Sequence, residues 1–187
     1  MIYAILATGP SMSQALADSV RGKAKVIAVS DSYRLAPWAD VLAASDRGWW
    51  RLHEPDFEGK KLCGVPVHGI ERIEGAVSGS NSGLLAIQAA VQMGAKTVLL
   101  LGYDMGASKG DHFFGSHPAP LRNTKPDRFE VFKKQFSQYQ PKGVRIWNCT
   151  EGSALTCYPM ARLEDVLNEY CDRACDQTRR RDVTFEV

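Results

Sequence analysis

Two histidines, His112 and His117, lie in the stretch GASKGDHFFGSHPAP, which has neither helical nor strand periodicity. An imidazole titrates near neutral pH, so either side chain could take a proton from a hydroxyl group as a general base. Asp104 ends the apolar run just before this stretch, and a carboxylate there could orient a histidine, hold a ribose or coordinate a metal. Because long irregular loops in compact domains are commonly lids or binding loops, we interpret the stretch as one. The alternative is structural, with packed histidines and a carboxylate that caps a helix or loop.

The two histidines differ in their neighbours. Pro118 restricts the backbone beside His117, and Gly115 lets the loop close over a ligand. His112 follows Asp111, and this pairing could make it a structural residue. We therefore expect His117 to be the base and keep His112 as the second candidate.

Residues 6–12, LATGPSM, form the first of two segments suited to bind an anion. An apolar run stops at Thr8 and Gly9, and a helical pattern follows. Pro10 suits the start of a helix, and Ser11 is expected to cap it. Because a helix N-terminus offers free N–H groups to an anion, phosphate could bind here; the alternative is a tight turn with no ligand.

The second such segment is SGSNSG, residues 78–83, which leads into a long apolar helix pattern. Small hydroxyl side chains, an amide and two glycines make a donor-rich turn that could hold a phosphate or a ribose hydroxyl. Helix capping accounts for Asn81 or Ser82 but not for all six residues. We therefore favour ligand contact by this segment, including Ser80 and Gly83.

Alternating strand and helix patterns position these segments. Continuous apolar runs predict strands, and apolar residues at helical spacing predict helices. Such alternation predicts an α/β fold, with one Rossmann-like domain over residues 1–175 and a mostly parallel, doubly wound sheet. Ligands of such sheets bind beyond the carboxyl ends of the strands, where Gly9 and Asp104 are expected to lie. The expected strands cover 1–7, 24–30, 39–45, 60–70, 96–104 and 143–149, and the expected helices cover 11–20, 82–94, 127–139 and 162–170.

Composition and charge limit the choice of partners. A net charge of +2 is too small to indicate a polyanion. The cluster Arg179–Arg181 is expected to belong to a solvated basic tail over residues 176–187, with nucleic-acid contact only weakly supported. The sequence has no signal-type segment and no run of about 18 apolar residues, so we expect a cytoplasmic protein with no membrane partner.

The cysteines and tryptophans each leave two interpretations. Five cysteines without a CxxC pair favour reduced structural thiols. Cys171 and Cys175 could share one helix face, but two thiols without further ligands do not complete a metal site.

Adjacent Trp49 and Trp50 cannot both enter one core from an extended segment, so one could face a ligand or partner. The alternative is that one lies in the core and the other covers its edge.

The order of five segments resembles a known family. LATGPSM, VIAVSDSY, SGSNSGLLAIQAAVQMGAKTVLLLGYDM, the histidine loop and RIWNCTEGSAL follow the order seen in bacterial sialyltransferases of glycosyltransferase family 42. The related domain of unknown function 115 group, which includes archaeal pterin pyrophosphokinase-like proteins and small phage-encoded proteins, shows the same order. The resemblance spans about residues 2–167, and the short chain with its tryptophan pair looks most like the phage-encoded members.

Carried over by position, the resemblance implies a nucleotide site and a loop histidine as base. The family usually has asparagine where this chain has Thr8 and Ser30. Because a hydroxyl replaces only part of an amide's donor and acceptor set, altered specificity is expected. The base is His117 or His112. The predicted nucleotide-binding residues are Thr8, Gly9, Pro10, Ser11, Ser30, Asp31, Ser80, Asn81, Ser82, Gly83, Gly102 and Asp104.

These features support three functions. The leading one is a metal-independent, glycosyltransferase-like enzyme that uses a nucleotide-activated donor and needs no cofactor. The second is a magnesium-dependent pterin-type pyrophosphokinase, in which Asp104 and Asp111 hold Mg²⁺. The third is a non-catalytic nucleotide-binding protein of a phage, which would act in the host cytoplasm. The acceptor stays open, and a homo-oligomer is compatible with the sequence.

Overall fold

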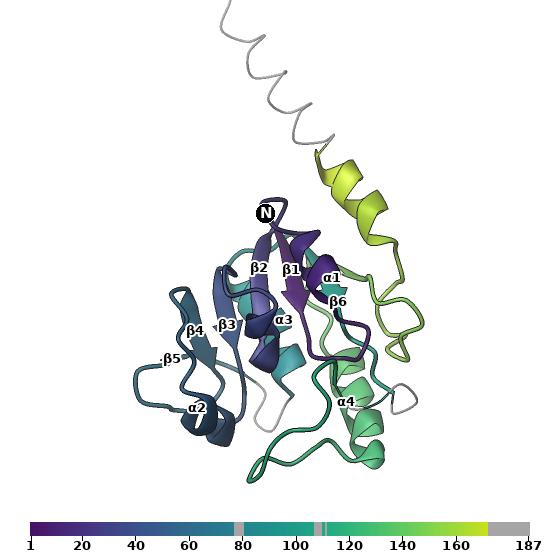
Figure 1. Ribbon diagram of the computed structural model, residues 1–187. Helices are drawn as coiled ribbons and strands as arrows, with labels where there is room; N and C mark the ends of the chain where they lie inside the picture. The colour runs from purple at the N-terminus through teal and green to yellow at the C-terminus, as the bar shows by residue number, and fades with distance from the viewer. Residues whose placement is uncertain (77–80, 107–109, 111, 172–187) are drawn as a thin grey trace, which may run out of the picture.

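A seven-stranded, all-parallel sheet forms the centre of the protein (Figure 1). The computed structural model describes residues 1–76, 81–106, 110 and 112–171. The strand order is β5-β4-β3-β2-β1-β6-β7, so the chain builds outward from β1 and then crosses back to add β6 and β7 on its other side. This arrangement confirms the predicted Rossmann-like α/β fold. The strands are β1 (Ile2–Leu6), β2 (Lys25–Val29), β3 (Val41–Ala43), β4 (Lys60–Cys63), β5 (Glu71–Arg72), β6 (Thr97–Leu101) and β7 (Arg145–Asn148).

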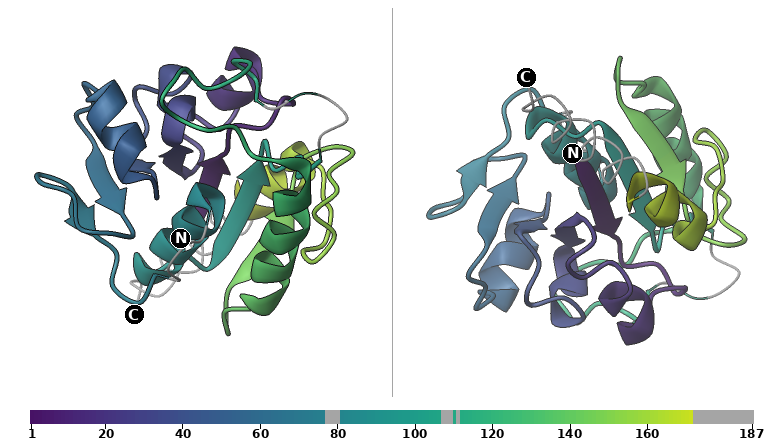
Figure 2. Two further views of the ribbon diagram at one scale, coloured as in Figure 1. Left: turned by 90° about the horizontal axis from the view of Figure 1, so that it is seen from below. Right: turned by 90° about the horizontal axis from the view of Figure 1, so that it is seen from above.

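Helices lie on both sides of the sheet (Figure 2). Successive strand residues point to opposite faces, and in β1 Tyr3 and Ile5 enter one buried cluster while Ala4 and Leu6 enter the other. Strand β1 is therefore apolar and buried at every position, as expected of a central parallel strand. The helices are α1 (Gln14–Asp18), the 3-10 helix η1 (Ser30–Arg34), α2 (Arg47–His53), α3 (Ser82–Gln92) and α4 (Pro126–Gln138), and residues 163–171 are also helical.

Helix α3 is fixed at both ends by the signals that the sequence contains. Asn81 caps its start, because its Oδ1 accepts a hydrogen bond of 2.7 Å from the backbone N–H of Leu84. Gly94 follows its end with a φ of 85°. The Tyr103 hydroxyl donates to the carbonyl oxygen of Gly83 at 3.0 Å. This bond holds the first turn of α3 beside the end of β6.

The first helix differs from the prediction. It covers only Gln14–Asp18, and its cap is Ser13 rather than Ser11. Ser11 has another partner, because its hydroxyl donates to Asp104 Oδ2 at 2.7 Å. The backbone N–H of Met12 donates to the Gly9 carbonyl oxygen at 3.0 Å, so residues 9–12 form a tight turn. The Gly9 segment therefore does not present a helix N-terminus to a ligand.

Both tryptophans of the pair are buried, with exposed fractions of 2% for Trp49 and 4% for Trp50. They lie on α2, where successive side chains are about 100° apart, so both can reach the interior. The Trp50 indole N–H donates to the Ala44 carbonyl oxygen at 2.9 Å. The Trp49 indole N–H donates to Asp31 Oδ2 at 2.8 Å. Both tryptophans therefore belong to the core; Trp49 in addition lines the pocket described below, so the interpretation that one of them faces a ligand stays a prediction.

The remaining expectations are tested only in part. Within the described residues, no helix combines the length and hydrophobicity needed to cross a membrane. Free thiols are found at Cys63, Cys149, Cys157 and Cys171. Burial raises the pKa of Cys149 to about 12, so this thiol stays protonated at neutral pH. Cys175 and the predicted basic tail, residues 176–187, lie outside the described residues.

Candidate functional site

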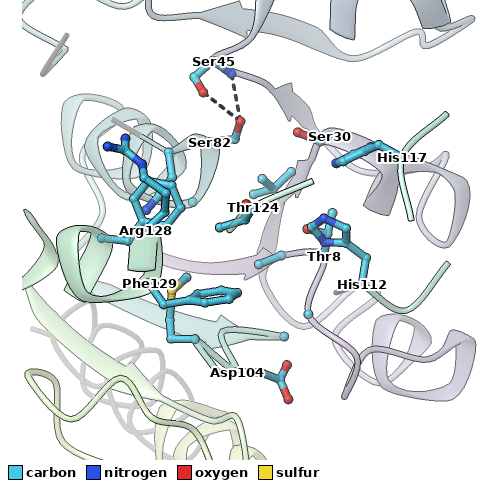
Figure 3. Close-up of a pocket in the computed structure, with 18 of the residues that line it drawn as sticks. Thr8, Ser30, Ser45, Ser82, Asp104, His112, His117, Thr124, Arg128 and Phe129 are labelled. Atoms are coloured by element: carbon cyan, nitrogen blue, oxygen red, sulfur yellow. Dashed lines mark hydrogen bonds between the residues drawn. The ribbon is translucent and has the colours of Figure 1, made fainter. Parts of the chain in front are cut away.

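A pocket of about 300 Å³ opens at the carboxyl ends of the central strands (Figure 3). It lies beside β1 and β6, where the strand order reverses, and ligands of doubly wound sheets bind at such switch points. We call one side the strand-end wall. It comprises Ala7, Thr8, Gly9, Pro10, Val29, Ser30, Ser45, Asp46, Trp49, Asn81, Ser82, Gly83, Gly102, Asp104, Met105 and Gly106. We call the other side the loop wall, which comprises His112, His117, Leu121, Arg122, Thr124, Arg128, Phe129 and Phe132.

The pocket gathers most of the residues predicted from the sequence. Two of the predicted nucleotide-binding residues do not line the pocket. The Ser11 hydroxyl donates a hydrogen bond to Asp104, and Asp31 is buried and accepts a hydrogen bond from Trp49. Ser80 lies outside the described residues. The predicted residues that line the pocket are Thr8, Gly9, Pro10, Ser30, Asn81, Ser82, Gly83, Gly102, Asp104, His112 and His117.

Two of the four glycines of the strand-end wall, Gly9 and Gly102, are required by the protein's own packing. The backbone N–H of Gly9 donates to the Gly102 carbonyl oxygen at 3.0 Å. A Cβ atom on Gly9 would overlap that carbonyl oxygen and Asp104 Oδ2. Gly102 has a φ of 74°, and a Cβ atom there would overlap Met12. The close approach of β1 to β6 therefore explains the glycine at position 9, and this glycine does not by itself indicate a ligand.

Asp104 has one oxygen in use and one without a partner. Its side chain is buried at the end of β6, with an exposed fraction of 7%. Oδ2 accepts from the Ser11 hydroxyl at 2.7 Å and from the Ser11 backbone N–H at 3.3 Å. Oδ1 is buried and has no hydrogen-bond partner among the residues that the structure describes. Because a buried carboxylate oxygen without a donor is unfavourable, this atom is where a ligand N–H or O–H group would be held.

In the turn before α3, as in Asp104, some polar atoms form hydrogen bonds within the protein and one has no partner among the described residues. Ser82 Oγ accepts from the backbone N–H of Ser45 at 2.9 Å and lies 3.0 Å from Ser45 Oγ, so it ties α3 to the end of β3 (Figure 3). Asn81 uses its oxygen to cap α3, whereas its Nδ2 is buried and has no hydrogen-bond partner within the described part of the chain. The capping role weighed from the sequence is confirmed for Asn81. The Nδ2 group remains as a donor at the pocket.

The loop wall brings the two histidines together. The backbone N–H of Phe113 donates to the Thr8 carbonyl oxygen at 3.1 Å, which fixes the loop on the turn after β1. The rings of His112 and His117 have centroids 4.6 Å apart. His112 also stacks on Phe114, with centroids 4.8 Å apart and planes 9° from parallel. Both predicted base candidates therefore line the same pocket, opposite the strand ends.

The environment of His117 keeps its ring neutral at physiological pH. Burial lowers the pKa of His117 below its ordinary value. His53 and Arg34 lower this pKa further, whereas Asp31 and Asp46 raise it. A neutral imidazole has one nitrogen lone pair, and this lone pair is what a general base needs.

Helix α4 adds side chains that the sequence reasoning missed. Phe129 and Phe132 line the pocket and are only half-buried, while Phe136 is fully buried in the core. The Arg128 guanidinium lies 5.4 Å from the centre of the Phe132 ring. Arg122, just before the helix, also lines the pocket. A sequence signal was present, because residues 126–138 contain three phenylalanines in a segment that is otherwise mostly polar.

Backbone geometry also marks the site. Ser30 and Met105 line the pocket, and each has a positive φ, 46° and 51° respectively. Non-glycine residues rarely adopt this conformation, and where they do they cluster at binding and active sites. These residues follow β2 and β6, so the strained turns lie on the strand-end wall.

Comparison of the chain with models of protein families, with curated proteins and with solved structures finds no significant match. The resemblance to the sialyltransferase-like proteins therefore stays a prediction. Within the described residues, no group of three or more histidine, cysteine, aspartate or glutamate side chains is arranged to hold a metal ion. Asp111, predicted as a magnesium ligand, lies outside the described residues.

Proposed function

We propose that this protein binds a nucleotide in the pocket and that it transfers a group from a nucleotide-activated donor, in the manner of a metal-independent glycosyltransferase. One observation carries the proposal: Asp104 and Asn81, which line a pocket that also contains His117, each have a buried polar atom, Oδ1 and Nδ2, without a hydrogen-bond partner among the described residues. A pocket with a few unpaired polar groups at a strand-order reversal is the usual binding site of this fold class.

The lining supplies each contact that a nucleotide needs. Asp104 Oδ1 can accept from a ribose hydroxyl, and Asn81 Nδ2 can donate to the ligand. Half-buried Phe129 and Phe132 offer aromatic faces to a base. Arg122 and Arg128 place positive charge at the same pocket, where phosphate oxygens can accept their hydrogen bonds.

His117 provides the chemistry of transfer. Its neutral ring takes the proton from an acceptor hydroxyl, and the acceptor oxygen forms a bond to the donor carbon. The bond between that carbon and the phosphate oxygen breaks, and its electron pair leaves on the phosphate. Arg122 and Arg128 stabilise the negative charge that develops there. The products are the modified acceptor, the free nucleotide and a protonated His117.

The first test is a thermal-shift screen of the full chain. The ligands are nucleoside mono-, di- and triphosphates and nucleotide sugars, each with and without magnesium. A ligand at about a hundred times its dissociation constant stabilises a fold by ~2.7 kcal/mol, which shifts the melting temperature measurably. We expect a nucleotide or nucleotide sugar to stabilise the protein without magnesium. Failure of every nucleotide to do so would overturn the proposal.

A second candidate, magnesium-dependent phosphoryl transfer, is favoured by one feature. Asp104 Oδ1 is an unpaired carboxylate oxygen, and such oxygens are the ligands that Mg²⁺ prefers. Nucleotide stabilisation that vanishes when a chelator is added would select this candidate. Tight binding without turnover of any nucleotide sugar would instead select a non-catalytic binding protein.

A further inference from the structure

One ring nitrogen of His117, Nδ1, faces a buried carboxylate. Nδ1 of His117 is buried, has no hydrogen-bond partner in residues 1–76, 81–106, 110 and 112–171, and lies 3.9 Å from Asp31 Oδ2. Asp31 itself is almost fully buried, with an exposed fraction of 1%. An imidazole has only two nitrogens, so Nε2 is the one left to meet a ligand. The sequence predicted Asp31 as a nucleotide contact, and the structure places it behind His117 instead.

Asp31 is held in place by two other donors. The indole N–H of Trp49 donates to Oδ2 at 2.8 Å, and the Arg34 guanidinium lies 2.9 Å from Oδ1. His53 Nε2 lies 3.9 Å from the same Oδ1. Trp49 is buried and also lines the pocket, so it links the carboxylate rigidly to the site. Packing of this kind fixes the direction in which Oδ2 faces Nδ1.

We propose that Asp31 is the positioning residue of His117: its carboxylate keeps the proton of the neutral ring on Nδ1 and thereby leaves the lone pair of Nε2 toward the ligand. A solvated neutral imidazole carries its proton mainly on Nε2, which would make that nitrogen a donor and useless as a base. A carboxylate beside Nδ1 reverses this preference, which is how a buried aspartate sets the tautomer of a catalytic histidine. The role of Nε2 as base rests on the proposed function, whereas the tautomer does not.

The 3.9 Å separation is longer than a hydrogen bond, and contacts of this kind are commonly long until a ligand closes the site. The attraction between the Nδ1–H group and the carboxylate already acts at this distance, so the tautomer is set in the free protein. The charged and titratable groups that face the ring are Asp31 and Arg34 of η1, Asp46 and His53 at the two ends of α2, and His112 of the loop.

The tautomer can be measured directly on the free, full-length protein. Long-range ¹H–¹⁵N correlation spectra above pH 7 distinguish a protonated Nδ1 from a protonated Nε2, and His117→Gln assigns the signal. We expect His117 to carry its proton on Nδ1 in the wild type. A proton on Nε2 in the wild-type protein overturns the proposal, whether or not any variant folds.

Two variants with opposite charge changes complete the test. Asp31→Asn removes the negative charge and is expected to lower the pKa of His117 and to abolish the preference for Nδ1. Arg34→Gln removes the positive charge on the other side of the carboxylate and is expected to raise this pKa while keeping the proton on Nδ1. Equal tautomer populations in all three proteins overturn the proposal. Protonation on Nδ1 without any transferase turnover would refute the proposed function and leave this inference intact.

Discussion

The two walls of the pocket differ in how much of their hydrogen-bonding capacity the protein uses itself. On the strand-end wall, Ser82 is tied to Ser45, Asp104 Oδ2 to Ser11, and Gly9 to Gly102. Only single atoms, such as Asp104 Oδ1, are left over. The loop wall instead lines the pocket with the imidazole of His117, with guanidinium groups and with aromatic rings. We infer from this difference that the strand-end wall determines the shape of the site, whereas the loop wall provides the groups that react.

This comparison predicts which property each substitution changes. Substitutions in the strand-end wall should alter stability or ligand affinity, because its polar atoms hold the strand ends together. Substitutions in the loop wall should alter turnover and leave the fold intact, because its side chains are attached to a loop and to one side of α4. A loop-wall residue required for folding, or a strand-end residue required only for turnover, would break the comparison.

The largest effect is expected for His117→Ala. Removal of a general base lowers turnover by roughly 10²- to 10⁴-fold, whereas nucleotide affinity stays close to that of the wild type. The measurements are steady-state kinetics with the nucleotide donor found by the screen and calorimetric titration with the corresponding nucleotide. His112→Ala is the matched control, because its ring lies 4.6 Å from that of His117 and lines the same pocket.

The two histidine variants separate the remaining alternatives. If His112→Ala loses turnover and His117→Ala keeps it, then His112 is the general base and His117 is not. If both variants turn over normally, the loop wall contains no general base, and the proposed division between the walls fails.

Gly9→Ala is expected to destabilise the protein by ~1–3 kcal/mol, since the new methyl group must displace backbone and carboxylate atoms. Those atoms belong to Gly102 and Asp104. Urea unfolding measures the change. Gly106→Ala is the control, because its Cβ atom would meet nothing closer than Ala154 Cβ at 3.8 Å, an ordinary contact. A Gly9→Ala protein of normal stability that no longer binds nucleotide would show that the ligand, not the packing, requires the glycine.

Asp104→Asn is expected to weaken nucleotide binding by about 10- to 100-fold, the size of one hydrogen bond to a charged acceptor. Ser11→Ala is the matched variant, because it removes the donor to the other oxygen of the same carboxylate and should change stability rather than affinity. Titrations with magnesium and with a chelator separate the two candidate functions. Contact with a ribose predicts an equal loss in both conditions, and a metal ligand predicts a loss only with magnesium.

The sequence predicted the residues of the strand-end wall well. It did not predict the contacts that Ser11 and Asp31 make with other residues of the protein. Continuous apolar runs located β1 and β6, and parallel strands place Gly9 and Asp104 at one edge by geometry alone. The partner of Ser11 could not be predicted in this way, because Asp104 lies 93 residues further along the chain. For the same reason Asp31 was assigned to the ligand, since its contacts with Trp49 and His117 depend on tertiary packing. Single-sequence patterns show which face a residue occupies, not which partner it meets there.

The smallest expected effect concerns the pH dependence of stability. A histidine in an unfolded chain titrates near pH 6.5, whereas burial lowers the pKa of His117 in the folded protein. Below about pH 6.5 the unfolded chain therefore binds a proton that the folded protein does not bind. The stability contributed by the neutral ring is complete above that pH and is lost as the pH falls through the lower, folded-state pKa.

His117→Gln should consequently show a weaker loss of unfolding free energy between about pH 7.5 and pH 5.5 than the wild type. Urea unfolding at both values measures this slope, and His68→Gln, at an exposed position, controls for the removal of one imidazole. If His117→Gln keeps the slope of the wild type, the loop wall does not bury His117 in solution, and the position given to its ring in the pocket is wrong.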